Sequence, residues 1–152
     1  MKIIDGIKEI CFNFDCNNER RFIHRNTLNE IKNFLENCNF ITQLEYPIIF
    51  DYKTTKGDTI FMKNGFIDLV AESNQIKIAI ELDSGNHLKY KSIEKLLKTN
   101  FDILIGIVKG NSGSPELIQE NIDRIKSKMN LNSKQIILIV MIDNSITYVN
   151  NT

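Results

Sequence analysis

Two neighbouring stretches of the sequence decide the fold, FIDLVAE at residues 66–72 and IKIAIELD at residues 76–83. Both are rich in the apolar and β-branched residues of strands, and the SNQ between them is typical of a tight turn. In the second stretch polar and apolar side chains alternate, which places Glu81 and Asp83 on one face of the strand. The two stretches are therefore predicted to pair as antiparallel neighbours, with Asp68 and Glu81 close together.

The segments on either side extend this pair into a mixed sheet. Upstream, a β-hairpin is predicted, with a strand at 46–52, a turn at 54–58 and a return strand at 59–62 that Asn64-Gly65 breaks or bulges. Downstream, residues 88–99 have the apolar spacing of a helix, and 101–108 (FDILIGIV) is almost wholly apolar, as in a central strand covered on both faces. Because a helix separates them, this strand is predicted to lie parallel to the one that carries Glu81.

The N-terminal part of the chain is predicted to be helical. Residues 25–37 carry apolar side chains at helical spacing, and Asn26 or Thr27 is the expected N-cap. Residues 3–14 fit a further short helix.

The C-terminal part completes the sheet. Ser114 is expected to cap a helix that begins at Pro115, and two strands follow at 135–142 and 146–149. The predicted order is α-β-β-β-α-β-α-β, an α/β fold with a mixed central sheet flanked by helices on both faces. Residues 1–152 are predicted to form a single domain.

The composition argues against several classes of protein. Apolar residues make up 42% and charged residues 25% of the chain, close to the average of soluble domains. No run approaches the roughly 20 apolar residues of a membrane helix, and the charges within MKIIDGIKEICF argue against a secretory signal. The three cysteines form no CxxC pair, which argues against a zinc site and a disulfide framework. These features predict a cytoplasmic protein without a membrane partner.

The formal net charge is zero, which counts against a protein that coats nucleic acid by charge alone. It remains compatible with an acidic site that is offset by local basic patches. Two such patches are Arg20, Arg21 and Arg25, and Lys89, Lys91, Lys95 and Lys98. Each patch is either a nucleic-acid contact or a solvated surface.

The informative polar residues are the acids inside strands. A carboxylate in a buried strand is costly unless it is paired or binds a metal. Asp68, Glu81 and Asp83 would bring three oxygen donors to one sheet face, which suits Mg²⁺ completed by waters and a substrate phosphate. The alternative is that these acids are structural and lie at the solvated end of the strands.

The order of the elements together with these acids resembles the core of the PD-(D/E)XK nucleases. Asp68 in GFIDLVAE and Glu81 in IAIELDSG match the two metal-binding positions of that family, and the resemblance covers about residues 26–108. It implies a restriction-endonuclease-like fold, Mg²⁺ or Mn²⁺ as cofactor, and hydrolysis of DNA phosphodiester bonds in restriction, repair or defence against mobile elements. Cutting both strands would need two sites, which makes a homodimer attractive.

One position departs from the family pattern, because Asp83 stands where a lysine is usual. The family tolerates a lysine that has moved to the following helix, and Lys91 is the first candidate, with Lys89 and Lys95 behind it. If no lysine reaches the site, the chain would be an inactive nuclease-fold module that binds nucleic acid or a protein partner.

Accessory roles follow from the same resemblance. Glu30 would add a helix-borne carboxylate, and His87 in DSGNH matches a variant third residue of some relatives. The predicted nucleic-acid contacts are Arg20, Arg21, Arg25 and Lys98. His24, beside this arginine group, is interpreted as a surface residue.

Overall fold

The structure, a computed structural model, describes residues 2–13, 20–54, 56–110, 115–129 and 134–150. Within these ranges the chain forms four helices and one six-stranded mixed sheet, in which the strand order follows the sequence. The elements are α1 Lys2–Phe12, α2 Arg20–Asn37, β1 Ile41–Lys53, β2 Thr59–Glu72, β3 Lys77–Asp83, α3 Tyr90–Lys98, β4 Ile103–Val108, α4 Pro115–Lys128, β5 Ile136–Val140 and β6 Ser145–Val149. The predicted α/β class with a mixed central sheet is confirmed.

The sheet is antiparallel at its edges and parallel in its centre. β1, β2 and β3 are successive antiparallel neighbours, and β5 pairs antiparallel with β6. β4 lies between β3 and β5 and is parallel to both. The predicted parallel crossover from β3 through α3 to β4 is therefore confirmed.

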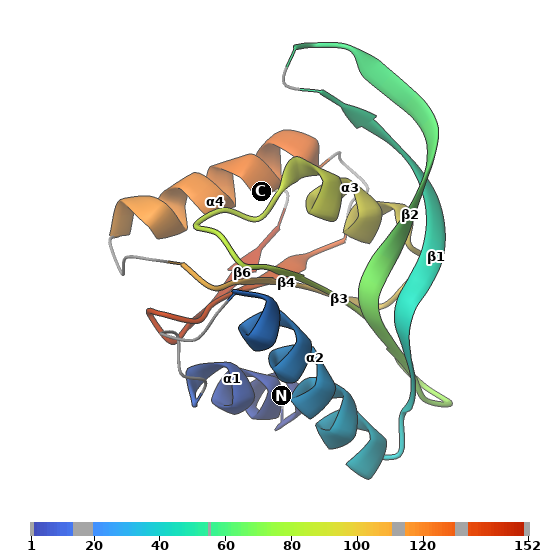
Figure 1. Ribbon diagram of the computed structural model, residues 1–152, viewed down its shortest axis with the longest axis vertical. Coiled ribbons are helices and arrows are strands. Elements are labelled where there is room, and N and C mark those ends of the chain that lie inside the picture. The colour runs from blue at the N-terminus through green and yellow to red at the C-terminus, as the bar shows by residue number, and fades with distance from the viewer. Residues whose placement is uncertain (1, 14–19, 55, 111–114, 130–133, 151–152) are drawn as a thin grey trace.

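Helices cover both faces of the sheet, with α1 and α2 on one face and α3 and α4 on the other (Figure 1). Successive side chains of β3 point to opposite faces of the sheet and so contribute to the hydrophobic cores on both faces. Ile78, Ile80 and Leu82 pack in the core beneath α1 and α2, whereas Ala79 packs in the core beneath α3 and α4. Glu81 shares the face of Ala79 and is 1% exposed, so this strand carries its carboxylate into the covered side of the sheet.

Helix α2 begins earlier than predicted, at Arg20 instead of residue 25. Ile23 is fully buried and continues the apolar stripe of Leu28 and Ile31 upstream by one turn. Asn26 and Thr27 therefore lie inside the helix and cannot be its N-cap. Ser114, the predicted cap of α4, lies outside the described residues.

The predicted break at Asn64-Gly65 is wrong, because β2 runs through both residues in register with Ile49 and Ile48 of β1. Gly65 serves packing, since a Cβ there would lie 2.7 Å from the ring of Phe50. The irregularity falls three residues earlier in the hairpin, where the register shifts between Phe50 and Tyr52 and Met62 has a φ of 50°.

The hairpin of β1 and β2 bends away from the sheet and projects past α3 (Figure 1). At the bend, Glu45 has a φ of 52° and lies between the pairs Leu44↔Leu69 and Tyr46↔Ile67, across from Asp68. The β2–β3 ladder also ends here, at Leu69↔Ile80. The bend therefore leaves the C-terminal end of β3 without a strand partner on its β2 side.

Among the described helices, none combines the length and apolar character that crossing a membrane requires.

Candidate functional site

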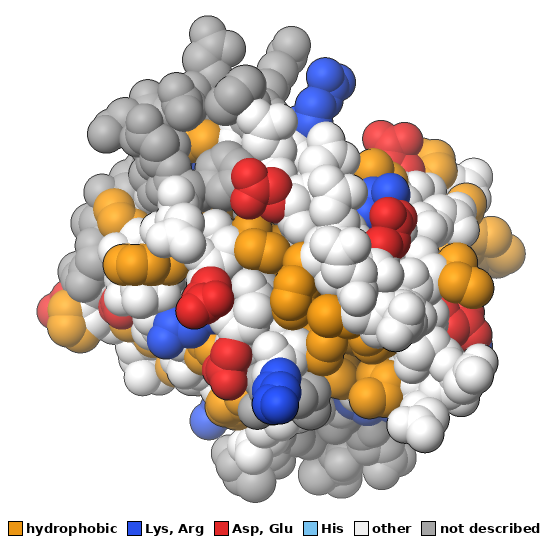
Figure 2. All heavy atoms as spheres, turned by 90° about the horizontal axis from the view of Figure 1, so that it is seen from below, with side chains coloured by type: hydrophobic (Ala, Val, Ile, Leu, Met, Phe, Trp, Pro, Cys, Tyr) orange, Lys and Arg blue, Asp and Glu red, His pale blue; other side chains and the backbone are white. Residues whose placement is uncertain are grey.

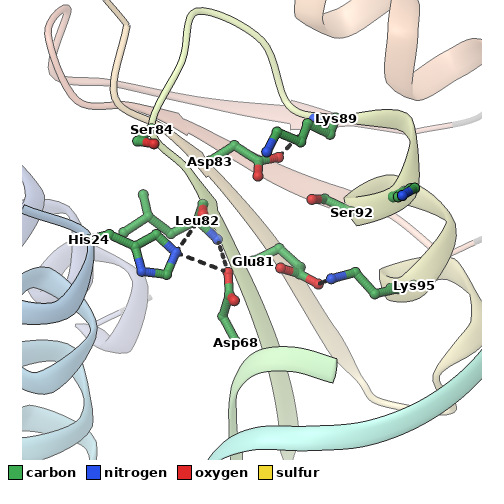
Figure 3. Close-up of a pocket in the computed structure, with 10 residues that line it drawn as sticks. His24, Asp68, Glu81, Leu82, Asp83, Ser84, Lys89, Ser92 and Lys95 are labelled. Carbon is green, nitrogen blue, oxygen red and sulfur yellow. Dashed lines mark hydrogen bonds and ion pairs between the residues drawn. The ribbon is translucent and has the colours of Figure 1, made fainter. Parts of the chain in front are cut away.

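Asp68 and His24 complete the backbone hydrogen bonding of β3 where the β2 ladder stops. Oδ2 of Asp68 accepts a hydrogen bond from the Leu82 N–H at 2.8 Å, and Nε2 of His24 lies 3.0 Å from the Leu82 carbonyl oxygen (Figure 3). The same Asp68 oxygen is 3.6 Å from His24 Nε2. Both groups of Leu82 that an adjacent strand would have bonded are thus satisfied by side chains.

Asp68 and Glu81 lie side by side as predicted, and their carboxyl groups share a hydrogen bond. Burial, followed by the charge of Asp68 and the hydrogen bond with it, raises the pKa of Glu81 to about 10, and Lys95 offsets part of this rise. Burial also acts to raise the pKa of Asp68, but hydrogen bonds with His24, Glu81 and the Leu82 N–H outweigh it and lower the pKa. At neutral pH the two carboxyl groups therefore share one proton.

Lys95 of α3 is the lysine that reaches this pair. Its Nζ lies 2.5 Å from Glu81 Oε1 and donates a hydrogen bond to the Phe66 carbonyl oxygen at 2.8 Å. The approach to Oε1 is not aligned for a hydrogen bond, so this buried oxygen has no well-placed donor among the residues that the structure describes. Lys95 holds this oxygen as an ion pair, so another cation would have to displace the ammonium group.

These side chains line a pocket of about 290 Å³ between the end of β3, helix α2 and the start of α3 (Figure 3). Acids enter it from the sheet and lysines from the α3 side. The lining residues are His24, Asp68, Glu81, Leu82, Asp83, Ser84, Lys89, Lys91, Ser92 and Lys95. Half of the side chains that the sequence singles out are thus in one place, namely the three strand acids together with Lys89, Lys91 and Lys95.

Asp83 has a different partner from the other two acids. It is 7% exposed, and its Oδ2 accepts a hydrogen bond from the Lys89 N–H at 2.8 Å. It thereby fixes the segment that leads into α3. Within the described ranges no group of three His, Cys, Asp or Glu side chains is arranged to hold a metal ion. Asp83 lines the same pocket as Asp68 and Glu81, and its place in the predicted set of three carboxylates stays a prediction.

The remaining predicted residues lie at the rim of the pocket or away from it. Lys91, the first lysine candidate, has its Nζ 4.9 Å from the centre of the Tyr52 ring in the hairpin. His87 is 2.6 Å from Glu120 and does not line the pocket. Glu30, Arg25 and Lys98 are exposed and also lie outside the lining. Arg20 and Arg21 are in the first turn of α2, and their side chains are outside the described part.

His24 is the pocket residue that the sequence interpretation missed. A hydrogen bond with Asp68 raises its pKa, more than burial lowers it. Its position offers a signal in retrospect, because residues 24, 28 and 31 lie on one helical face and Leu28 and Ile31 are buried beneath the sheet.

The donor set fits Mg²⁺ in part. Two adjacent carboxyl groups in a polar pocket, one of them with an oxygen lacking an aligned donor, suit an ion that proteins hold by one or two carboxylates plus waters and phosphate. Binding would require the proton shared by the pair to leave and Lys95 to give up its contact with Oε1.

Comparison of the chain with protein-family models, with curated proteins and with solved structures finds no match in any of the three. Function must therefore be inferred from the side chains of this pocket.

Proposed function

We propose that the chain is a Mg²⁺- or Mn²⁺-dependent nuclease of the PD-(D/E)XK type that hydrolyses DNA phosphodiester bonds. The observation that carries the proposal is the group of Asp68, Glu81 and Lys95 in one pocket, with Lys95 Nζ 2.5 Å from Glu81. Two strand-borne carboxylates and one lysine are the chemical groups that the family resemblance requires.

The proposal assigns the missing lysine to helix α3. Asp83, at the usual lysine position, cannot offset the negative charge that builds up on a phosphate during hydrolysis. Lys95 is a cation with 15% of its side chain exposed and already faces Glu81 from the opposite wall. Its position supports this assignment, because it brings a cation to the carboxyl pair without an additional element.

Each pocket residue then has a distinct role. Asp68 and Glu81 would hold the ion, which when bound supplies an activated water and neutralises phosphate charge. Once Glu81 holds the ion, the Lys95 ammonium group is released from Glu81 and orients the attacking water or the scissile phosphate. Lys89 and Lys91 attract the phosphate from the rim. Cutting both strands of a duplex would require two such pockets and hence two copies of the chain.

The alternative is a nuclease-fold module that binds nucleic acid without cutting it. It is favoured by the structural partner that each acid already has, the Leu82 N–H for Asp68, Lys95 for Glu81 and the Lys89 N–H for Asp83. Because each carboxyl group has a partner within the protein, the three acids can be explained by their structural role alone, without a bound metal or a catalytic function.

Cleavage and metal binding distinguish the two proposals. Wild-type protein should nick DNA with Mg²⁺ or Mn²⁺, and Lys95→Gln should slow cleavage on the order of a hundredfold while DNA affinity measured in Ca²⁺ stays nearly constant. Lys126→Gln, an exposed change on α4 outside the pocket and outside the predicted nucleic-acid contacts, is the matched control. Calorimetric titration should show divalent-ion binding that Asp68→Asn removes.

Retained binding without cleavage of DNA or RNA in either ion would establish the silent module instead. Absence of both binding and cleavage would reject a nucleic-acid function altogether.

A further inference from the structure

The hairpin of β1 and β2 carries unpaired lysines toward the pocket. Its inner face is held against α3 by two contacts, the Lys91 ammonium over Tyr52 and the hydrogen bond from Lys95 to the Phe66 carbonyl oxygen. Within the hairpin, the Phe50 ring lies 5.8 Å from the Tyr52 ring. The hairpin is therefore a supported arm beside the pocket, and Figure 1 shows it projecting past α3.

The lysines of this arm follow one another along its length. Lys63 pairs in register with Phe50, which places its side chain on the inner face toward α3. Lys91 lies next along this face, over Tyr52, and Lys56 is exposed in the turn at the tip. Together with Lys89 at the pocket rim they form what we call the lysine lane, Lys56, Lys63, Lys89 and Lys91.

The lysines of the lane have no ion-pair partners in the part of the chain that the structure describes. None of its four ammonium groups has a carboxylate partner there, whereas Lys32, Lys77 and Lys128 elsewhere on the surface lie within 4 Å of Glu36, Glu72 and Glu94. Basic side chains on the face seen in Figure 2 are also interspersed with acidic ones. The hairpin also carries the exposed acids Asp51 and Asp58, but neither forms an ion pair with the lane among the described residues. A row of lysines without ion-pair partners that leads to a pocket is complementary to a polyanion.

The dimensions of the arm suit a nucleic-acid backbone. At about 3.3 Å per residue, the strand from Phe66 to the turn spans about 25 Å. One strand of a duplex presents a phosphate about every 3.4 Å, so the arm covers on the order of seven nucleotides beyond the pocket. Two-stranded β-ribbons are also among the elements that fit along DNA grooves.

We propose that the β1–β2 hairpin is a nucleic-acid-binding arm whose lysine lane holds the phosphate backbone of duplex DNA that enters the pocket. The inference rests on the proposed function, because it takes the same substrate class, but it concerns binding at a distance from the reacting groups. The arm supplies affinity and orientation, and the hairpin lysines Lys56 and Lys63, which lie outside the pocket lining, do not touch the scissile phosphate.

The test measures DNA binding without cleavage, with a chelator present. A fluorescent duplex of about 20 base pairs is titrated with wild-type protein, with Lys56→Gln/Lys63→Gln and with Lys2→Gln/Lys126→Gln, a control that removes the same charge outside the arm. The arm variant should bind about tenfold more weakly, and the slope of log affinity against log salt should fall by about two. The control should bind like wild type.

A second probe tests the reach of the arm. A stem-loop of about five base pairs spans about 17 Å, less than the arm, so the arm variant and wild type should differ far less on it than on the long duplex. Equal loss on both probes would show that the lysines act at the pocket and would overturn the arm.

The possible failures are distinguishable. If wild type binds and the arm variant binds equally well, the arm is wrong and the pocket function stands. If wild type binds no DNA, the proposed function is wrong and the arm falls with it. If the arm variant changes the sedimentation coefficient and leaves DNA affinity unaltered, the hairpin is a contact between copies of the chain, which also overturns the proposal.

Discussion

At the scale of single residues, Asp68 serves the fold as well as the proposed chemistry. One of its oxygens accepts the Leu82 N–H at the point where β2 leaves β3, and the carboxylate also contacts His24 and Glu81. A substitution of Asp68 therefore changes both stability and metal binding. Lys95 is the cleaner probe of the proposed activity, because its contacts are with one carboxylate and one carbonyl oxygen.

Stability in the absence of divalent ions should fall as the solution becomes alkaline, and Glu81 is the main cause. Its pKa is raised from 4.5 to about 10 by burial first and then by Asp68. Between these values the folded chain holds a proton that the unfolded chain has released, so the free energy of unfolding decreases with rising pH, by up to about 1.4 kcal/mol per pH unit. The raised pKa of His24 acts in the same direction.

Urea unfolding at about pH 6 and about pH 9 measures this dependence. Glu81→Gln mimics the protonated carboxyl and should flatten the decline, leaving the variant more stable than wild type at the higher pH. Glu116→Gln, an exposed change in α4, is the control and should keep the wild-type slope. An undiminished decline in Glu81→Gln would mean that Glu81 is not the group that holds the proton.

At the scale of elements, the strands and their pairing were predictable because the signals are local. The alternation in 76–83 and the apolar run at 101–108 fixed the neighbours β3 and β4, and with them the meeting of Asp68 and Glu81. The beginning of α2 was missed by five residues because helix ends carry weak signals and Ile23 adds only one apolar position. Glu45, where the hairpin bends, has no sequence signature of its positive φ.

The identity of the pocket lysine could not be predicted for a similar reason. Successive helix residues are about 100° apart around the axis, so the residue that faces the pocket depends on the helix register to within one position. Lys91, Ser92 and Lys95 all face the pocket side of α3, and the two lysines differ in the partner that each reaches, the Tyr52 ring for Lys91 and Glu81 for Lys95. The packing of Ile93 and Leu96 in the core sets the rotation of α3 about its axis. This packing depends on the tertiary fold, so the sequence alone does not predict which lysine reaches Glu81.

The segment between β3 and α3 depends on one buried amide from α4. Asn121 is fully buried, and its Oδ1 accepts the Leu88 N–H at 2.7 Å while its Nδ2 donates to the carbonyl oxygens of Asn86 and Leu117. Asn121→Ala leaves these buried groups without partners and should lower the free energy of unfolding by about 2–4 kcal/mol. Urea unfolding measures the change.

Gln119→Ala is the matched control on the same helix, because the Gln119 side chain is exposed and bonds only to Asp123 among the described residues. It should change stability by less than about 0.5 kcal/mol. A loss in Asn121→Ala no larger than in this control would show that solvent replaces the amide and that the segment holds itself in place.

At the scale of the whole molecule, two features lie on the same side of the sheet. The pocket opens between the end of β3 and the start of α3, and the hairpin extends beside it past the same helix (Figures 1 and 3). The zero net charge of the chain conceals this arrangement, because acidic residues elsewhere in the sequence balance the positive charge of the lane. Charge distribution, which sequence composition averages away, is therefore the stronger guide to the partner.

The number of pockets predicts the form of the cleavage product. The described residues provide one pocket that contains the Asp68–Glu81 pair, so a monomer should cut one strand in each encounter. At concentrations where sedimentation gives a monomer, supercoiled DNA with Mg²⁺ should yield nicked circles first, and linear molecules should follow only as second nicks accumulate. With DNA sites in large molar excess over all chains, so that the chains do not compete for DNA, a catalytically silent Lys95→Gln chain added in excess of the active chain should then leave the rate per active chain unchanged. If linear DNA appears directly and the excess of silent chains suppresses it, two copies act together on the duplex, and the active form is the homodimer.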